Sequence, residues 1–109
     1  MSVLEKLFGI LHTNGIYRSL RDFSRNCCGM NTNWASYQRH KNRDLSLQAT
    51  IACLGTIELQ IMLSEKSGIA LNSAQIEALC AGRALLTCFL FEKYGLFVMD
   101  GRLLDVRRA

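Results

Sequence analysis

Residues 18–43 read RSLRDFSRNCCGMNTNWASYQRHKNR, and this stretch contains the signals of two short helices separated by a glycine. Ser19 is a good N-cap for the first helix, Gly29 is the residue type that ends it, and Asn31 can cap the second. The helices are predicted over residues 20–28 and 32–40. Two short helices joined at a glycine, the second of them basic and polar, have the layout of a helix-turn-helix.

The second predicted helix divides into an inner and an outer face. Trp34 and Tyr37 are expected to turn inward, Ser24 allows the two helices to approach closely, and Met30 fills the core beneath the turn. The outer residues suit contacts with base edges in a DNA groove, which Asn and Arg make with paired hydrogen bonds. The expected base contacts are Thr32, Asn33, Ser36, Arg39 and His40. The expected phosphate contacts are Arg18, Arg21, Arg25, Lys41, Arg43 and the Tyr37 hydroxyl.

The charge of the chain is concentrated in its first half. The 109 residues carry a formal net charge of +4, and residues 1–45 hold seven basic and three acidic residues. Residues 46–109 hold six of each, so the whole excess belongs to the part that contains the two short helices. This asymmetry favours a polyanion as the partner of the N-terminal part.

The same residues carry a resemblance to a known class of proteins. The run from Arg18 to Arg25, followed by Gly29, Trp34, Ser36 and the Ser46-Leu47 pair, resembles small proteobacterial helix-turn-helix proteins related to the lambda-repressor and Cro class. The similarity covers roughly residues 13–60, and it implies a DNA-binding fold with a recognition helix at residues 32–40. Two features depart from that pattern. One extra residue separates Ser24 from Gly29, and Ala35 stands where a second aromatic is expected.

The rest of the chain is predicted to be mostly helical. Val3, Leu7, Ile10 and Leu11 lie at helical spacing, and Asn14-Gly15 ends that segment. Ser46 caps a long apolar helix that continues to Lys66, and Asn72 with Gln75 forms a near capping box for a helix that continues to Tyr94. Asp100-Gly101 then predicts a β-hairpin. The fold class is therefore all-α, a helix-turn-helix core with a C-terminal two-helix extension and a short terminal β-hairpin.

The chain is expected to form one domain that pairs with a second copy. Residues 1–66 would make the helix-turn-helix core, and residues 67–109 the dimerisation helix and hairpin. The helix that ends at Tyr94 is apolar on more than one side, so one side is expected to meet another subunit. The expected dimer interface consists of Leu85, Phe89, Leu96 and Val98. Arg83 on the same helix needs a carboxylate or a path to solvent, and Glu58 is a possible partner.

Several other classes of protein are not expected. The five cysteines lack metal-ligand spacing, so they are interpreted as buried reduced thiols, with no metal and no cofactor. No phosphate loop, nucleophile elbow or paired carboxylates on a cleft occur, so the chain is not expected to be an enzyme and shows no small-molecule site. The longest apolar run, residues 84–91, is far shorter than the roughly 20 residues of a membrane span. Together with a start unlike a signal peptide, this predicts a cytoplasmic protein.

These patterns favour sequence-specific binding of double-stranded DNA. The expected form is a homodimeric transcriptional regulator that represses by occupying its operator, because two recognition helices are needed for tight binding. The alternative is a small helical protein-interaction module, an inhibitor or adaptor, whose basic face binds an acidic protein.

Overall fold

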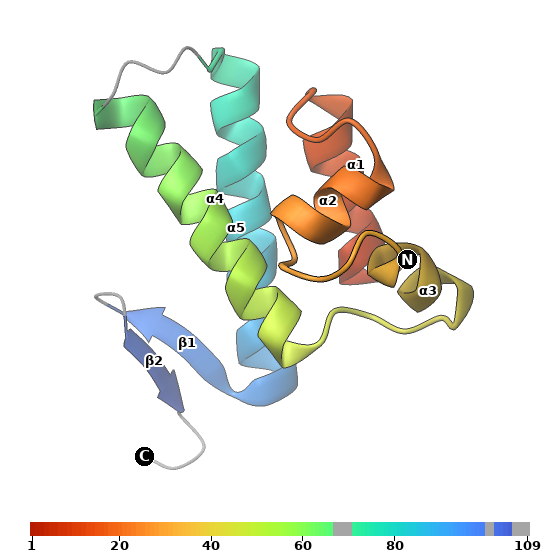
Figure 1. Cartoon of the computed structure of the whole chain (residues 1–109). Helices are drawn as coiled ribbons and strands as arrows, with labels where there is room; N and C mark the ends of the chain where they lie inside the picture. Colours follow the sequence, from red (N-terminus) through yellow and green to blue (C-terminus); the bar gives the residue numbers. More distant parts are fainter. Residues whose placement is uncertain (67–70, 100–101, 106–109) are drawn as a thin grey trace.

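The computed structural model describes residues 1–66, 71–99 and 102–105, with helices through most of its length (Figure 1). The helices are α1 (Val3–Thr13), α2 (Leu20–Asn26), α3 (Trp34–His40), α4 (Leu47–Lys66) and α5 (Ser73–Tyr94), and the strands are β1 (Leu96–Met99) and β2 (Arg102–Asp105). The two strands pair antiparallel, with Leu96 opposite Asp105 and Met99 opposite Arg102. The expected all-α fold with a C-terminal hairpin is confirmed.

Helix α5 is the element against which the others assemble. It packs beside α4 along much of its length and contacts α1 on another side, while α2 and α3 pack together next to α1 (Figure 1). Gly82 makes this close approach possible, because a Cβ atom at that position would lie 3.0 Å from Leu7 Cδ1 and 3.3 Å from Ile57 Cδ1. One glycine of α5 therefore lies where side chains of α1 and α4 converge.

The ends of α5 are fixed by local chemistry that the sequence predicts. The Gln75 amide donates to the Asn72 side chain at 2.8 Å, and the Asn72 amide donates to the Gln75 side chain at 3.1 Å, which completes the capping box. The Gln75 side chain also donates to the Asn14 carbonyl at 3.1 Å, so the start of α5 is tied to the end of α1. Gly95 ends the helix in the left-handed conformation, with φ of 65°.

The start of α1 is held by a residue distant in sequence. The Glu5 amide donates to the Ser2 hydroxyl at 3.1 Å, a local cap. The amides of Val3 and Leu4 donate to the Asp44 carboxylate at 3.0 and 2.9 Å. A carboxylate at a helix N-terminus satisfies unpaired amides and lies at the positive end of the helix dipole. Asp44 thereby joins the segment that follows α3 to the first turn of α1.

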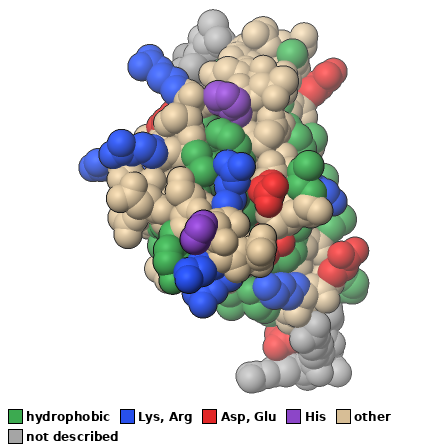
Figure 2. Space-filling model, turned by 90° about the vertical axis from the view of Figure 1, so that its right-hand side faces the viewer, with side chains coloured by type: hydrophobic (Ala, Val, Ile, Leu, Met, Phe, Trp, Pro, Cys, Tyr) green, Lys and Arg blue, Asp and Glu red, His purple; other side chains and the backbone are tan. Residues whose placement is uncertain are grey.

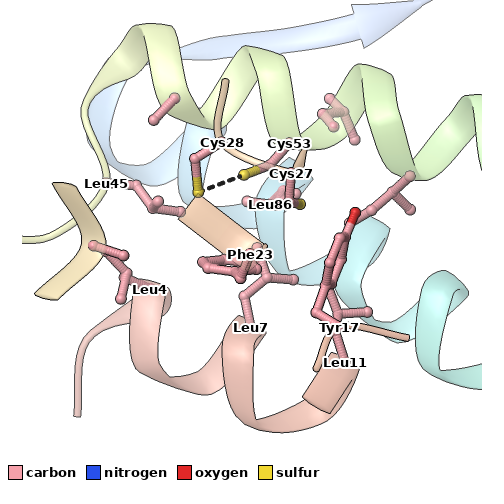
Figure 3. Packing of buried hydrophobic residues seen from close by; sticks show 14 of the residues in the cluster. Leu4, Leu7, Leu11, Tyr17, Phe23, Cys27, Cys28, Leu45, Cys53 and Leu86 are labelled. Atoms are coloured by element: carbon pink, nitrogen blue, oxygen red, sulfur yellow. Dashed lines mark hydrogen bonds between the residues drawn. The ribbon is translucent and has the colours of Figure 1, made fainter. Parts of the chain in front are cut away.

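The core contains thiols among its apolar side chains (Figure 3). Cys27, Cys28 and Cys53 are buried, and the Sγ atoms of Cys28 and Cys53 lie 3.4 Å apart without a disulfide. Hydrogen bonds to Cys27 and Cys28, together with burial, raise the pKa of Cys53. The prediction of buried reduced thiols holds for these three, whereas Cys80 is half-buried and Cys88 is exposed. The buried large side chains around them come from α1, α2, α4, α5 and two connections between helices: Leu4, Leu7, Leu11, Tyr17, Phe23, Leu45, Ile57, Leu79, Leu86 and Leu90.

Candidate nucleic-acid interface

A buried hydroxyl holds α2 and α3 together. Ser24, fully buried on α2, donates through Oγ to the Asn31 carbonyl at 2.6 Å and accepts from the Ala35 amide at 3.1 Å. The small residue expected at this position thus also supplies the polar contact that fixes the start of α3. Ala35, where an aromatic was expected, is fully buried.

The connection between α2 and α3 is longer than predicted. Helix α2 ends at Asn26 instead of residue 28, and α3 begins at Trp34 instead of residue 32, so seven residues separate them. The usual helix-turn-helix connection has about three or four. Gly29 takes the predicted positive φ, at 67°. The Asn31 side chain accepts from the Asn33 amide at 3.0 Å, a turn that precedes the helix and delays its start.

The inner face of α3 differs from the prediction at one residue. Trp34 is half-buried and packs on the core as expected. Tyr37 does not turn inward, because 49% of its surface is exposed. Gln38 takes the inner position instead, and its side-chain amide donates to the Asp44 carbonyl at 2.9 Å. Helix α3 therefore buries Ala35 and the Gln38 side chain, and it leaves Tyr37 at the surface.

Two cationic side chains lie near the ring of the exposed Tyr37. Lys41 Nζ and Arg43 Cζ each lie 5.9 Å from the centroid of its ring. This is the distance at which a cation is attracted to an aromatic face. Three of the expected phosphate contacts are therefore neighbours at the end of α3.

The other expected phosphate contacts lie around α2, and all are exposed: Arg18, Arg21 and Arg25. Arg18 and Asp22 are close, because the Arg18 amide donates to the Asp22 carboxylate at 3.0 Å. This hydrogen bond, followed by one from the Asn26 side chain, lowers the pKa of Asp22. The carboxylate therefore stays ionised beside these cations at neutral pH.

Three of the expected base contacts meet in one surface hollow. Ser36, Arg39 and His40 line it together with Glu5 and Leu20. Asn33 is exposed but precedes α3, and Thr32 is only partly exposed. Sequence reasoning missed Glu5, because its place beside α3 depends on the distant contact between Asp44 and the start of α1.

The face formed by α1, α2 and α3 carries mixed charge. Figure 2 shows Lys and Arg side chains spread over this view, both histidines among them, and acidic side chains between and beside them. The cations occur as separate groups on the surface. A ligand on this face would meet several cations and at least one carboxylate, that of Glu5.

The comparisons with known proteins place the chain in a family. A family model described as a family of unknown function, DUF6626, matches residues 4–87. The chain belongs to the DUF6626 family. The matched residues include α1 from Leu4 onward, α2 to α4 and most of α5, hence every residue of the hollow on α1, α2 and α3. No curated protein and no solved structure matches the chain. The description of this family does not mention the lambda-repressor and Cro class, so that resemblance stays a prediction.

The predicted dimer interface on α5 stays a prediction, and the structure shows what else packs on that side of the helix. The second apolar side of α5 is covered by α1 within the DUF6626 region, and Leu85 lines a groove with α1 residues such as Gly9 and Ile10. Leu85, Phe89 and Leu96 are partly buried against the core of the same chain. The Val98 side chain lies outside the described residues. The large apolar side chains with the greatest exposure on the long helices lie elsewhere: Ile51, Leu59, Met62 and Phe91.

Two further findings concern α4 and α5. Within the described residues, both helices are long enough and apolar enough to cross a membrane by length and composition alone. The argument from uninterrupted apolar runs did not detect them. Both also supply core residues, such as Ile57 and Leu86, as the core helices of soluble proteins do, so this is weak evidence for a span and the cytoplasmic location stays a prediction. No group of three or more His, Cys, Asp or Glu residues in the described chain is placed to hold a metal ion.

Proposed function

We propose that the chain is a sequence-specific double-stranded DNA-binding protein in which α3 is the recognition helix. The observation that carries the proposal is the arrangement of α3, whose Ser36, Arg39 and His40 share one surface hollow. A second support is the cluster of Lys41 and Arg43 on the Tyr37 ring, next to the hollow at the end of the same helix. Base-reading residues flanked by phosphate-binding cations are what groove recognition requires.

The biological role that fits this activity is transcriptional regulation by a pair of chains. Each α3 has seven residues and so spans about 10 Å, enough for a few base pairs. A second recognition helix, one DNA turn away, would supply the remaining affinity and specificity. Occupying an operator and blocking other proteins is the simplest use of such a pair.

Binding of genomic DNA fragments, followed by sequencing of those retained, tests the activity directly. We expect enrichment of a short sequence, and a steep fall in affinity as the salt concentration rises, because bound phosphates release counterions. If the protein retains no DNA at low salt, the proposal is contradicted. Retention without sequence enrichment would contradict its specificity.

Single substitutions on α3 separate reading of bases from binding of phosphates. Arg39→Ala and Asn33→Ala should each lower affinity for the enriched sequence by roughly 1–3 kcal/mol and change binding to random DNA much less. Lys41→Ala and Arg21→Ala should weaken both equally and flatten the salt dependence. Lys93→Ala removes one charge from the last turn of α5 and serves as the matched control, with affinity expected to stay unchanged. If all four variants bind like this control, α3 is not the recognition helix.

The alternative function, a protein-interaction module that uses the same face, is favoured by one observation. Glu5 places a carboxylate in the hollow among Ser36, Arg39 and His40. A carboxylate repels DNA phosphates, whereas it can pair with a lysine or arginine of a protein partner. Glu5→Gln distinguishes the two functions, because it should strengthen binding of random DNA if α3 faces a duplex. A Glu5→Gln variant with unchanged DNA affinity would favour the alternative.

A further inference from the structure

The outer side of α4 carries an apolar seam that the rest of the described chain leaves uncovered. Ile51, Leu59 and Met62 have 42%, 50% and 42% of their surfaces exposed. With Gly55 they follow the spacing 4, 4 and 3, so they lie within an arc of about 80° on the helix. In Figure 1, α4 runs along the outside of the molecule with α5 behind it.

Along the seam, a large side chain and a glycine with open space above it lie one helical turn apart. A Cβ atom at Gly55 would meet nothing within 4 Å, so the helix backbone is open to contact there. Leu59, one turn further along, is the most exposed of the seam's side chains. If a second α4 lies antiparallel across the first, Leu59 of each copy can fill the space over Gly55 of the other. Ile51 of each copy then lies near Met62 of the other.

The charges along α4 also distinguish between the two possible orientations. A parallel pair in register would place Glu65 of each copy at the carboxyl end of the other α4, which is the negative end of the helix dipole. An antiparallel pair places Glu65 of one copy near the first turn of the other α4, which contains no acidic residue. That turn is the positive end of the helix dipole, where a carboxylate is stabilising. Shape and charge thus favour the same arrangement, in which each copy presents the same surface to the other.

We infer that two copies of this chain pair through antiparallel α4 helices, with Leu59 of each copy over Gly55 of the other. The seam formed by Ile51, Gly55, Leu59 and Met62 is the interaction surface. This pairing uses a different surface from the interface predicted on α5. The pairing deepens the proposed function, because two paired chains would read two half-sites, and this use of the pairing rests on the proposed function. The pairing itself is testable without DNA.

Sedimentation of the full chain at tens of micromolar, in the absence of DNA, measures the pairing. The unmodified chain should sediment at twice its 12.3 kDa mass. Gly55→Leu fills the hole and should weaken self-association by about tenfold or more, because two leucines then meet at each contact. Gly9→Leu is the matched control, since a Cβ at Gly9 also meets nothing within 4 Å but lies on α1.

A double substitution tests the register itself. Gly55→Leu combined with Leu59→Gly exchanges the side chain and the hole, and the two-fold relation makes the exchanged surfaces complementary again. We expect this double variant to pair more tightly than either single variant. Circular dichroism confirms that each variant keeps its helices, so a loss of pairing can be separated from a loss of folding.

Other outcomes would contradict either the pairing or the proposed function, and they can be told apart. A monomeric unmodified chain overturns it, and so does a monomer that co-sediments with anionic phospholipid vesicles, because lipid would then cover α4. A Gly55→Leu variant that stays dimeric, or a folded double variant without recovery, excludes this seam and register. A dimer that fails to bind DNA leaves the pairing intact and overturns the proposed function instead. A monomer that binds DNA overturns the pairing and leaves the proposed function intact.

Discussion

The hydroxyl of Ser24 determines how α3 begins. It is fully buried and has both a donor and an acceptor role, toward the Asn31 carbonyl and from the Ala35 amide. Asn31 is exposed, so water can replace the hydroxyl at its carbonyl, whereas the Ala35 amide is buried and has no such alternative. A buried amide without a partner costs free energy, so the hydroxyl stabilises α3 mainly through Ala35.

Ser24→Ala should therefore lower the free energy of unfolding by about 1–3 kcal/mol, the cost of one unpaired buried donor. Urea unfolding followed by circular dichroism measures it. Ser36→Ala removes the same group from the exposed side of α3 and should change stability by less than about 0.5 kcal/mol. Equal effects of the two substitutions would show that the Ser24 hydrogen bonds add nothing to the free energy of unfolding.

Tyr17 presents the opposite case, a buried hydroxyl without a partner. The ring packs edge-on against Phe23, and the hydroxyl, directed toward the α4 side of the core in Figure 3, makes no hydrogen bond within the described residues. Burial, and after it the neighbouring Cys27 thiol, raises the pKa of Tyr17. The group therefore stays protonated through the physiological pH range, and its cost is that of a desolvated neutral hydroxyl.

Tyr17→Phe should leave the protein as stable as before or raise its free energy of unfolding by about 1 kcal/mol, because it removes the unpaired hydroxyl and keeps the ring. The same urea experiment decides this. Tyr37→Phe, at an exposed tyrosine, is the control and should have almost no effect. A loss of stability at Tyr17 would show that its hydroxyl has a partner.

At the scale of elements, two helical glycines have opposite surroundings. Gly9 on α1 is exposed, and a Cβ atom there would have no neighbour within 4 Å, whereas Gly82 on α5 is buried against Leu7 and Ile57. Alanine favours a helix over glycine by about 1 kcal/mol at either position. Only at Gly82 does the added methyl group also press on neighbouring helices.

Gly9→Ala should thus raise the free energy of unfolding by about 0.5–1 kcal/mol. Gly82→Ala should gain less, and Gly82→Val should lose roughly 1–3 kcal/mol, because a larger side chain separates α5 from α1. Thermal unfolding of the three variants ranks them. Gly82→Val as stable as the unmodified protein would mean that α1, α4 and α5 do not converge at this residue.

Local signals in the sequence predicted most elements but not their relations. Ser19, Asn72 and Gly95 fixed helix ends because caps depend on neighbouring residues. The two ends that face the α2–α3 connection were each misplaced by two residues, because the Asn31 turn competes with helix at its own position. Tyr37 was misassigned for another reason. A seven-residue helix has few inward positions, and the buried Ala35 and Gln38 already occupy them.

For the whole molecule, the core lies entirely within the helical part of the described chain. The fully or almost fully buried apolar side chains among the described residues run from Leu4 to Leu90, and the two described side chains of β1, Leu96 and Phe97, are partly buried. The part of the site that sequence could not predict, Glu5 beside α3, also depends on contacts between distant segments. Such contacts have no signature in any local window of residues.

A chain that ends at Gly95 should therefore remain folded. We expect full helical circular dichroism and a cooperative thermal transition, with a melting temperature lowered by some degrees because the Leu96 contacts are lost. Loss of cooperativity would show that the hairpin is part of the core. Proteolysis at low protease concentration provides a second measurement, since the helical part of the shortened chain should resist cleavage.

The bond between Asp44 and the start of α1 has a consequence for hydrogen exchange. Amides in the first turn of a helix normally exchange with solvent quickly, because they lack partners within the helix. The amides of Val3 and Leu4 should exchange slowly, because their exchange requires the contact between the two segments to open. Their exchange rates in deuterium oxide, measured by NMR, therefore report on the docking of α1 against the segment after α3, and Asp44→Ala should turn these two slow amides into fast ones.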